Sequence, residues 1–282
     1  MKASGKPRTL TLNGGKLLST LELNDDHRLF YERIEGDPQK PCLVFLHEGL
    51  GCSAMWSHFP RRLCDFTGCP GLLYDRLGYG LSSSFASAGR TIHYLHDYAL
   101  GELPRVLEAL IPSQAYVLVG HSDGGSIALI FAAGRPTMLK GVISESAHVY
   151  VDDKTLQGIR QADRAYDQGK LDGLRRYHGE KTHAIFKAWS RTWCSPWFRH
   201  WNIEYLLPSV EAPVLVIQGC EDQYGTLEQM ASIVSQTAGP AEKWIVEACG
   251  HSPHLDQPDL VLHKMAAFIE AVGGEASGRP RD

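Results

Sequence analysis

Short apolar runs alternate with longer amphipathic stretches along most of the chain. Several runs, such as CLVFL and YVLVG, are apolar at nearly every position, which is typical of parallel strands covered on both faces. Seven runs are predicted to be strands: Arg28–Ile34, Cys42–His47, Gly71–Asp75, Tyr116–Gly120, Gly141–Ser144, Val214–Gly219 and Lys243–Ala248.

The stretches between these strands have helical patterns. They are Ala54–Phe66, His93–Leu110, Gly125–Ala133, Leu227–Thr237 and Leu260–Val272. Strands that alternate with helices predict an α/β fold with a mostly parallel sheet and helices on both faces. The segment Thr9–Glu35 has no intervening helix, so its strands are expected to form an antiparallel edge of the sheet.

One long segment interrupts this alternation. From about His148 to Leu207 the chain shows helical patterns, charges and aromatic residues, but no buried strand pattern. A segment of that length inside an α/β domain is more typical of an inserted subdomain than of a loop. We therefore expect a core of residues 1–147 and 208–282, with a helical cap or lid inserted at 148–207.

Composition and charge narrow the function classes. The chain has 282 residues, 43% of them hydrophobic, and a formal net charge of −4, which argues against disorder and against a nucleic-acid surface. No apolar run approaches the roughly 20 residues of a membrane helix, and the N-terminus lacks the apolar region of a signal peptide. A cytoplasmic protein without a nucleic-acid or membrane partner is expected, and its oligomeric state is left open.

The seven cysteines are scattered, odd in number and without a CxxC pair. This pattern favours buried thiols over disulfides, and no metal site is expected. Cys249 lies two residues before His251, but nothing nearby singles it out as a nucleophile.

The strongest chemical signal is Gly120-His-Ser122-Asp-Gly124, placed directly between an apolar strand and a helix. A Gly-x-Ser-x-Gly sequence in that context is a sharp turn that presents the serine above the sheet, at a helix N-terminus that favours developing negative charge. Gly120 and Gly124 must be small for the turn to close. Ser122 is the predicted nucleophile.

A serine hydroxyl needs a base and an orienting acid, and on this scaffold they follow in the order Asp then His. Asp222 lies just beyond the strand that ends at Gly219, and His251 lies just past the next strand. Asp222 has an alternative interpretation as the N-cap of the following helix. His254 competes with His251, but the glycine before His251 favours His251 as the base.

The loop after the strand at Cys42–His47 reads His47-Glu48-Gly49-Leu50-Gly51. Such a loop can turn a backbone N–H toward the substrate oxygen, to act with the N–H of the residue after the nucleophile. Gly49 and Asp123 are the predicted oxyanion-hole donors, with Leu50 as an alternative to Gly49. The sequence Asp75-Arg-Leu-Gly-Tyr-Gly-Leu-Ser82 is interpreted as a structural turn beside the site.

Together these motifs resemble the α/β-hydrolase superfamily from about residue 25 to 272. The resemblance implies an eight-stranded sheet, a catalytic triad of Ser122, Asp222 and His251, an oxyanion hole at Gly49 and Asp123, and no cofactor. The oxyanion loop of the family usually begins His-Gly, whereas Glu48 stands here. Glu48 is expected to point into solvent or to pair with a basic group.

The predicted cap holds four tryptophans at a spacing of four: Trp189, Trp193, Trp197 and Trp201. This spacing places side chains on one helical face, and Pro196 suggests a new helix with Ser195 as its N-cap. Such a stripe commonly packs a cap onto its core. Some of the rings, with Phe186 or Tyr205, are also expected to roof a substrate pocket.

The predicted function is therefore hydrolysis of a small, largely apolar or aromatic carboxylic ester through an acyl-enzyme. Thioesters, lactones and amides remain open as substrates. The competing hypotheses are a hydrolase of carbon–carbon bonds in ring-cleavage-type diketones, a lyase or cofactor-free oxygenase, and a non-catalytic ligand receptor on the same fold.

Overall fold

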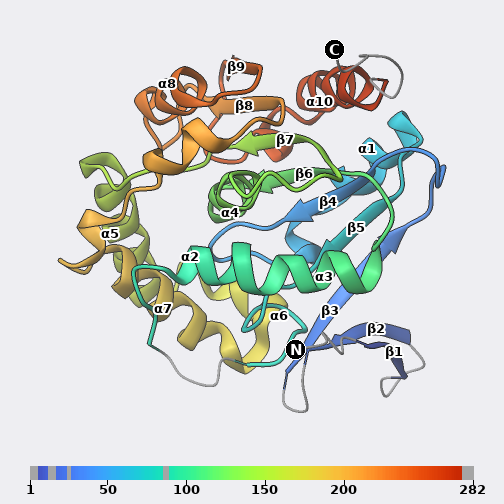
Figure 1. Ribbon diagram of the computed structural model, residues 1–282. Helices are drawn as coiled ribbons and strands as arrows, with labels where there is room; N and C mark the ends of the chain where they lie inside the picture. The colour runs from blue at the N-terminus through green and yellow to red at the C-terminus, as the bar shows by residue number, and fades with distance from the viewer. Residues whose placement is uncertain (1–5, 12–16, 24–26, 85–88, 275–282) are drawn as a thin grey trace.

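The computed structural model describes residues 6–11, 17–23, 27–84 and 89–274. A sheet of nine strands crosses the centre of this part, in the order β1-β2-β3-β5-β4-β6-β7-β8-β9 (Figure 1). The strands are β1 (Lys6–Thr11), β2 (Leu17–Glu22), β3 (Arg28–Ile34), β4 (Cys42–Leu46), β5 (Gly71–Tyr74), β6 (Tyr116–His121), β7 (Leu139–Glu145), β8 (Val214–Gly219) and β9 (Ala241–Val246).

The sheet is mostly parallel with one antiparallel edge. β1, β2 and β3 pair in antiparallel fashion and β3 joins β5 in the same way, while every pair from β5 to β9 is parallel. All seven strands expected from the sequence are present, and the antiparallel edge is confirmed. The resemblance implies eight strands, whereas the described residues have nine, and the outermost strand of the antiparallel edge, β1, pairs with β2.

Helices cover both faces of the sheet, and a further group lies to one side (Figure 1). The α-helices are α1 (Phe59–Thr67), α2 (Tyr94–His96), α3 (Leu103–Leu110), α4 (Asp123–Ala132), α5 (Asp153–Asp167), α6 (Arg175–His178), α7 (Thr182–Trp193), α8 (Leu227–Gln236), α9 (Pro253–Asp256) and α10 (Pro258–Gly273). The 3₁₀-helices are η1 (Ser53–Trp56), η3 (Asp172–Leu174), η4 (Gly179–Lys181), η5 (Phe198–His200) and η6 (Glu204–Ser209), and η2 (Asp97–Glu102) is a π-helix. None of the helices in the described ranges is long and apolar enough to cross a lipid bilayer.

Alternating residues of the strands build two apolar layers. On β4, Val44 and Leu46 belong to the layer that contains residues of α3, α4 and α8, whereas Leu43 and Phe45 belong to the layer under α1 and α10. Side chains two apart in a strand share a face, so each continuous apolar run serves both layers. This explains why β4 is apolar at every position and β6 is apolar until it reaches His121.

Two of the expected helices are divided in the structure. The stretch His93–Leu110 is divided into α2, the π-helix η2 and α3. Pro104 has no N–H to donate to the carbonyl four residues back, so a regular helix is interrupted there. The stretch Ala54–Phe66 is divided into η1 and α1, and Pro60 lies in the first turn of α1, where a proline is well tolerated.

Residues 148–207 contain helices α5, α6 and α7 together with short 3₁₀ turns. In this range an isolated bridge between Tyr150 and Asn202 is the one strand-like pairing of the described residues. α5, α6 and α7 lie together at one side of the sheet (Figure 1). The division of the chain into a core and a cap stays a prediction.

Candidate active site

Ser122 lies in a strained turn between β6 and α4. Its backbone has φ 53° and ψ −117°, a region that L-residues rarely adopt, and it is the residue immediately before the first turn of α4. A Cβ on Gly120 would lie 2.3 Å from the Gly124 carbonyl oxygen, and a Cβ on Gly124 would lie 1.9 Å from the Leu46 carbonyl oxygen. Glycine is therefore required at both positions by close backbone packing.

Asp222 and His251 form a buried pair on neighbouring loops. His251 Nδ1 lies 2.9 Å from both carboxylate oxygens of Asp222. A carboxylate accepts hydrogen bonds, so Nδ1 carries the proton and Nε2 keeps its lone pair. Asp222 does not cap the next helix, since Thr226 is the N-cap of α8.

The Asp222 carboxylate is held in its ionised form. Burial opposes ionisation, but His251 and the N–H groups of Tyr224 and Gly225 outweigh it and keep the pKa of Asp222 well below its usual range. These N–H groups lie 2.8 Å and 3.1 Å from Oδ1. Burial also disfavours the charged form of His251, but the carboxylates of Asp222, Glu48 and Glu145 raise its pKa above 6.5. The pair is thus built to stabilise a positive charge on His251.

A pocket of about 220 Å³ joins Ser122 to His251. Its wall combines residues from the strand ends with residues from the helical segment 148–207. The lining residues are Glu48, Gly49, Leu50, His121, Ser122, Asp123, His148, Thr155, Ile159, Ala162, Leu171, Leu174, Trp189, Trp193, Gln223, Tyr224, His251 and Ser252.

The expected oxyanion donors also lie on this pocket. Asp123 is the first residue of α4, where N–H groups have no partner within the helix. Leu50 N–H donates to the side chain of Glu48, so this alternative donor is already engaged. Gly49 therefore stays the expected donor of the loop, and there is little room above it: a Cβ at Gly49 would lie 2.8 Å from the Trp189 ring.

Arg76, interpreted from the sequence as part of a structural turn, ties the two sides of this donor pair together. Its Nη2 donates to the carbonyl of Glu48 at 2.7 Å, and its Nη1 lies 3.9 Å from the Asp123 carboxylate. The Glu48 carbonyl and the Gly49 N–H belong to one planar peptide unit and point in opposite directions. Holding the carbonyl therefore fixes the direction of the Gly49 N–H. Arg76 is fully buried, with the rings of Tyr79 and Tyr98 at 4.8 Å and 4.9 Å.

The expectation for Glu48 is wrong in both of its forms. The side chain lines the pocket instead of pointing into bulk solvent, and its carboxylate accepts from Leu50 N–H instead of pairing with a basic group. The short spacing explains this, because a carboxylate can reach the N–H two residues ahead in a turn. Burial raises the pKa of Glu48.

His254 forms a second pair with a different carboxylate. Its Nδ1 lies 3.0 Å from both oxygens of Glu145, and its backbone N–H donates to the same side chain at 2.7 Å. Both side chains are almost completely buried, and the His254 ring packs on Trp56 with 4.5 Å between centroids. His254 does not line the pocket that contains Ser122.

The four tryptophans do not share one helical face, because α7 ends at Trp193. Trp189 and Trp193 line the pocket. Trp197 is 44% exposed and lies away from it, and Trp201 is buried in the core against Phe198. The next element is the short turn η5, which begins at Phe198 and not at Pro196.

The two other aromatic residues proposed for the pocket roof do not line it either. Phe186 is fully buried and stacks on Tyr166 with 3.9 Å between centroids, and Tyr205 is 65% exposed. Their position in the segment 148–207 did not show whether they line the pocket, because neighbouring residues of a helix can face different surroundings.

The pocket residues that the sequence analysis did not single out include His148 and Tyr224. His148 Nε2 donates to the Tyr224 carbonyl at 3.1 Å, and burial lowers the pKa of His148. The ring of Tyr224 lies 4.8 Å from that of His251. Both residues lie in loops that follow a strand of the parallel sheet, β7 for His148 and β8 for Tyr224. This position after a strand end could have indicated that they lie near the site.

Cys249 is unsuited to be a nucleophile. It is buried in the apolar layer under α1 and α10, and burial raises its pKa to about 12. A thiol that stays protonated does not attack a carbonyl group. This supports the interpretation of the cysteine as a packed thiol.

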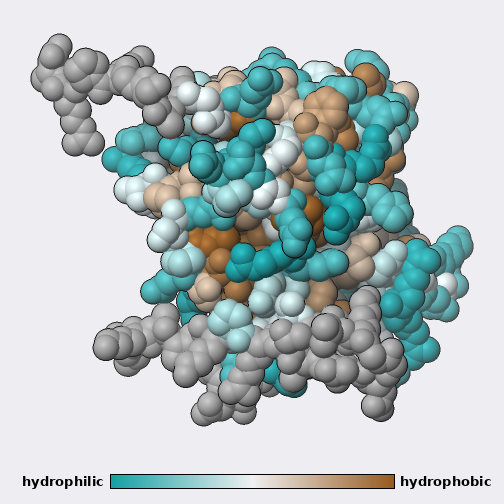
Figure 2. All heavy atoms as spheres, turned by 90° about the vertical axis from the view of Figure 1, so that its right-hand side faces the viewer, coloured by the Kyte–Doolittle hydropathy of each residue, from teal (hydrophilic) through white to brown (hydrophobic). Residues whose placement is uncertain are grey.

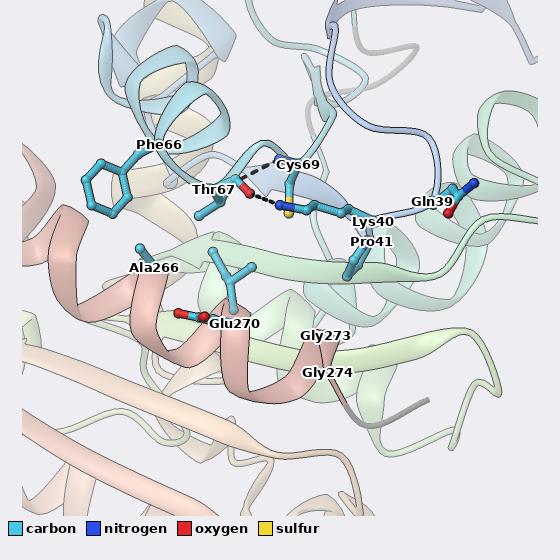
Figure 3. Close-up of a pocket in the computed structure, with 11 residues that line it drawn as sticks. Gln39, Lys40, Pro41, Phe66, Thr67, Cys69, Ala266, Glu270, Gly273 and Gly274 are labelled. Carbon is cyan, nitrogen blue, oxygen red and sulfur yellow. Dashed lines mark hydrogen bonds between the residues drawn. The ribbon is translucent and has the colours of Figure 1, made fainter. Parts of the chain in front are cut away.

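A larger hollow of about 480 Å³ lies on another face of the molecule, between α1 and the end of α10 (Figure 3). The Lys40 ammonium group there donates to the Thr67 carbonyl, and Glu270 extends from α10. None of the predicted site residues lines it. The face seen in Figure 2 is mostly hydrophilic, with hydrophobic residues in separate patches.

Comparison with known proteins identifies the family. A model of the alpha/beta hydrolase family matches residues 43–264, which is most of the chain, and the chain belongs to this family of enzymes. The match contains the elbow at Ser122 as well as Asp222 and His251.

Individual proteins add detail. The chain is 31% identical over 157 residues to 2-succinyl-6-hydroxy-2,4-cyclohexadiene-1-carboxylate synthase from Enterobacter sp. (strain 638), a match that spans 55% of this chain and 54% of that relative. The fold of this chain is similar to that of a thermophilic esterase from Thermogutta terrifontis, with 17% identity and a TM-score of 0.65. The similarity covers 95% of this chain and 99% of the esterase. The fold is also similar to that of a meta-cleavage product hydrolase from Pseudomonas fluorescens IP01, with 17% identity, a TM-score of 0.68 and 87% and 95% covered.

Proposed function

We propose that the chain is a serine hydrolase that cleaves a small, largely apolar or aromatic carboxylic ester. One observation supports this most strongly. Ser122, in strained backbone at the start of α4, lines the same pocket as His251, whose Nδ1 is held by Asp222. A nucleophile, a base and an orienting acid on adjacent loops are the components of acyl transfer.

In the proposed reaction, Ser122 Oγ attacks the ester carbonyl and His251 Nε2 takes its proton. Asp222 keeps the ring oriented and stabilises the imidazolium. The N–H groups of Gly49 and Asp123 donate to the oxygen that becomes negative. The alcohol leaves with the proton from His251, and water, activated by the same ring, hydrolyses the acyl-enzyme.

The pocket wall favours an apolar acyl group. Its side toward the helical segment is formed by Ile159, Ala162, Leu171, Leu174, Trp189 and Trp193. Aliphatic and aromatic walls with a few polar groups at one end bind small apolar ligands, with the polar end fixing the reacting bond. The helical segment thus acts as the cap that selects the substrate.

A second candidate is hydrolysis of a carbon–carbon bond beside a ketone, as in ring-cleavage products. The fold of this chain is similar to that of a meta-cleavage product hydrolase, which is consistent with this reaction. The same three residues serve both ester and carbon–carbon bond hydrolysis, so the substrate decides between them. A ligand receptor on the same fold would bind in this pocket with little turnover.

The test begins with the nucleophile. A fluorophosphonate probe should label the wild-type protein, and Ser122→Ala should abolish labelling with an unchanged melting temperature. Ser126→Ala is the matched control: this serine lies one turn further along α4 and donates to the His148 carbonyl at 2.6 Å. Labelling that persists in Ser122→Ala, or disappears in Ser126→Ala, would contradict the assignment.

The bond type is tested by a hydrolysis screen of one purified sample. The panel contains aliphatic esters of increasing length, aromatic esters, thioesters and ring-cleavage diketones. Ester turnover that depends on Ser122 supports the proposal. Turnover of the diketones alone would establish the second candidate, and binding without turnover would favour the receptor.

A further inference from the structure

The charges on the pocket wall are unbalanced. Its lining residues within the described chain include two carboxylates, Glu48 and Asp123, but no lysine or arginine. The Asp123 carboxylate accepts from the Tyr94 hydroxyl at 3.0 Å and has the guanidinium of Arg76 at 3.9 Å. Its charge is therefore compensated from behind the pocket.

In the part of the chain that the structure describes, the Glu48 carboxylate has no cation within ion-pair distance, and the charges of His251 and Arg76 act on it only from further away. It accepts from Leu50 N–H, and in the described ranges it forms no ion pair with a lysine, arginine or histidine. Arg76 binds the backbone carbonyl of Glu48 and not its side chain. Because the other pocket carboxylate has a cationic partner within 4 Å, Glu48 is the pocket carboxylate with the least direct compensation.

Glu48 is also placed where an acyl group must bind. It directly precedes Gly49, the proposed donor to the reacting oxygen, and it lines the pocket together with Ser122 and His251. Its charge is felt at the proposed base, since it contributes to the raised pKa of His251. A charged group on the substrate in this pocket would therefore interact with Glu48 directly.

We propose that Glu48 is a specificity-determining residue that makes the site accept uncharged acyl groups and reject acyl groups that carry a carboxylate. The inference rests on the proposed ester hydrolysis and names its substrate class.

The physical reason has two parts. A substrate carboxylate loses its hydration on entering an apolar pocket, and no lysine or arginine on the wall replaces the lost interactions. It then lies near a second carboxylate in surroundings that screen charge poorly. If Glu48 takes up a proton to avoid this repulsion, the free energy of that protonation is added to binding, and burial, which raises the pKa of Glu48, makes this cost smaller than for an exposed carboxylate.

The experiment compares two esters that differ in one charge: the mono-4-nitrophenyl ester of adipic acid and the same compound with its free carboxylate methylated. The quantity measured is the ratio of kcat/KM for the neutral ester to that for the anionic ester. Like charges brought together cost several kcal/mol, so the wild-type ratio is expected to be about 100 or more. In Glu48→Gln, which keeps an acceptor for Leu50 N–H, the ratio should fall by about tenfold.

Glu270→Gln is the matched control. It removes the same charge from α10, on the hollow shown in Figure 3 and away from the site, and should leave the ratio unchanged. Glu48→Gly, which restores the usual residue of the family loop, is the second variant if Glu48→Gln does not fold. A ratio that falls equally in the control, or not at all in either Glu48 variant, would overturn the inference. If the wild-type protein hydrolyses neither ester in a Ser122-dependent way, the proposed function itself is refuted.

Discussion

Two carboxylate–histidine pairs lie next to each other at the carboxyl end of the sheet, and they differ in what they face. Asp222 holds His251 Nδ1 at 2.9 Å, and Glu145 holds His254 Nδ1 at 3.0 Å. The His121 ring lies between them, 5.1 Å from the His251 ring and 5.0 Å from that of His254. The hydrogen-bond distances alone do not distinguish a proposed catalytic pair from a structural one.

The surroundings do distinguish them. The His251 side chain is 13% exposed and lines the pocket with Ser122, whereas the His254 side chain is 3% exposed and packed on Trp56 and Phe59. A general base must reach the proton that it removes. Access of the ring to the pocket, and not the presence of a carboxylate, therefore decides which pair is expected to act in catalysis.

The largest expected effect separates the two histidines. His251→Ala should lower kcat by about 10⁴-fold or more, in the range of triad knockouts in serine hydrolases. His254→Ala should cost far less activity, because its ring does not line the pocket, and should lower the melting temperature instead. The comparison is measured with one ester and one thermal scan for each variant. A dead His254→Ala beside an active His251→Ala would reverse the assignment of the base.

The two acids should separate in the same way. Asp222→Asn should keep the fold and lower kcat by about 10⁴-fold, because the ring loses its orienting partner. Glu145→Gln should weaken the hydrogen bonds that the carboxylate accepts from Nδ1 and the backbone N–H of His254, and should lower the free energy of unfolding by about 1.5–3 kcal/mol. Denaturant titrations and steady-state rates of both variants provide the check.

The pH dependence of that stability has a definite sign. Although burial opposes ionisation, His254 and His121 lower the pKa of Glu145 below its usual 4.5. A depressed acid stabilises the fold above about pH 4.5 and loses this contribution as the pH falls through its folded pKa. The stability difference between wild type and Glu145→Gln should therefore shrink in acid, and a constant difference would show that charge is not its origin.

Much of the molecule was predictable from the sequence. The seven strands, the elbow at Ser122 and the positions of Asp222 and His251 after strand ends follow from local patterns of apolar runs and glycines. The interpretation of Glu48 failed, and the contacts of Arg76 were not foreseen, because both side chains reach backbone groups of a loop. Local patterns do not report which backbone atom a buried side chain reaches, and only the folded loop places Arg76 against the Glu48 carbonyl.

The tryptophans differ in the same way as the two carboxylate–histidine pairs, because Trp189 lines the pocket and Trp197 does not. Trp189→Ala should change the ratio of kcat/KM between a short and a bulky ester by roughly 10- to 200-fold, as expected for a lost contact of 1–3 kcal/mol. Trp197→Ala is the control on the exposed side and should change neither this ratio nor the melting temperature appreciably. An unchanged ratio in Trp189→Ala, with a lowered melting temperature, would mean that this ring only packs.

The smallest expected effect concerns the pH profile of kcat/KM, which reports on the Asp222–His251 pair and not on the Glu145–His254 pair. Burial disfavours the imidazolium of His251, but Asp222, Glu48 and Glu145 together raise its pKa above 6.5. The base must be unprotonated, so kcat/KM for a neutral ester should fall as the pH drops through that raised pKa. Glu48→Gln removes one of the charges that stabilise the imidazolium, and the acid limb should move to lower pH. Glu270→Gln lies on the distant hollow and should leave the limb in place. A limb that stays fixed in Glu48→Gln would mean that this carboxylate does not act on His251, whatever its effect on substrate charge.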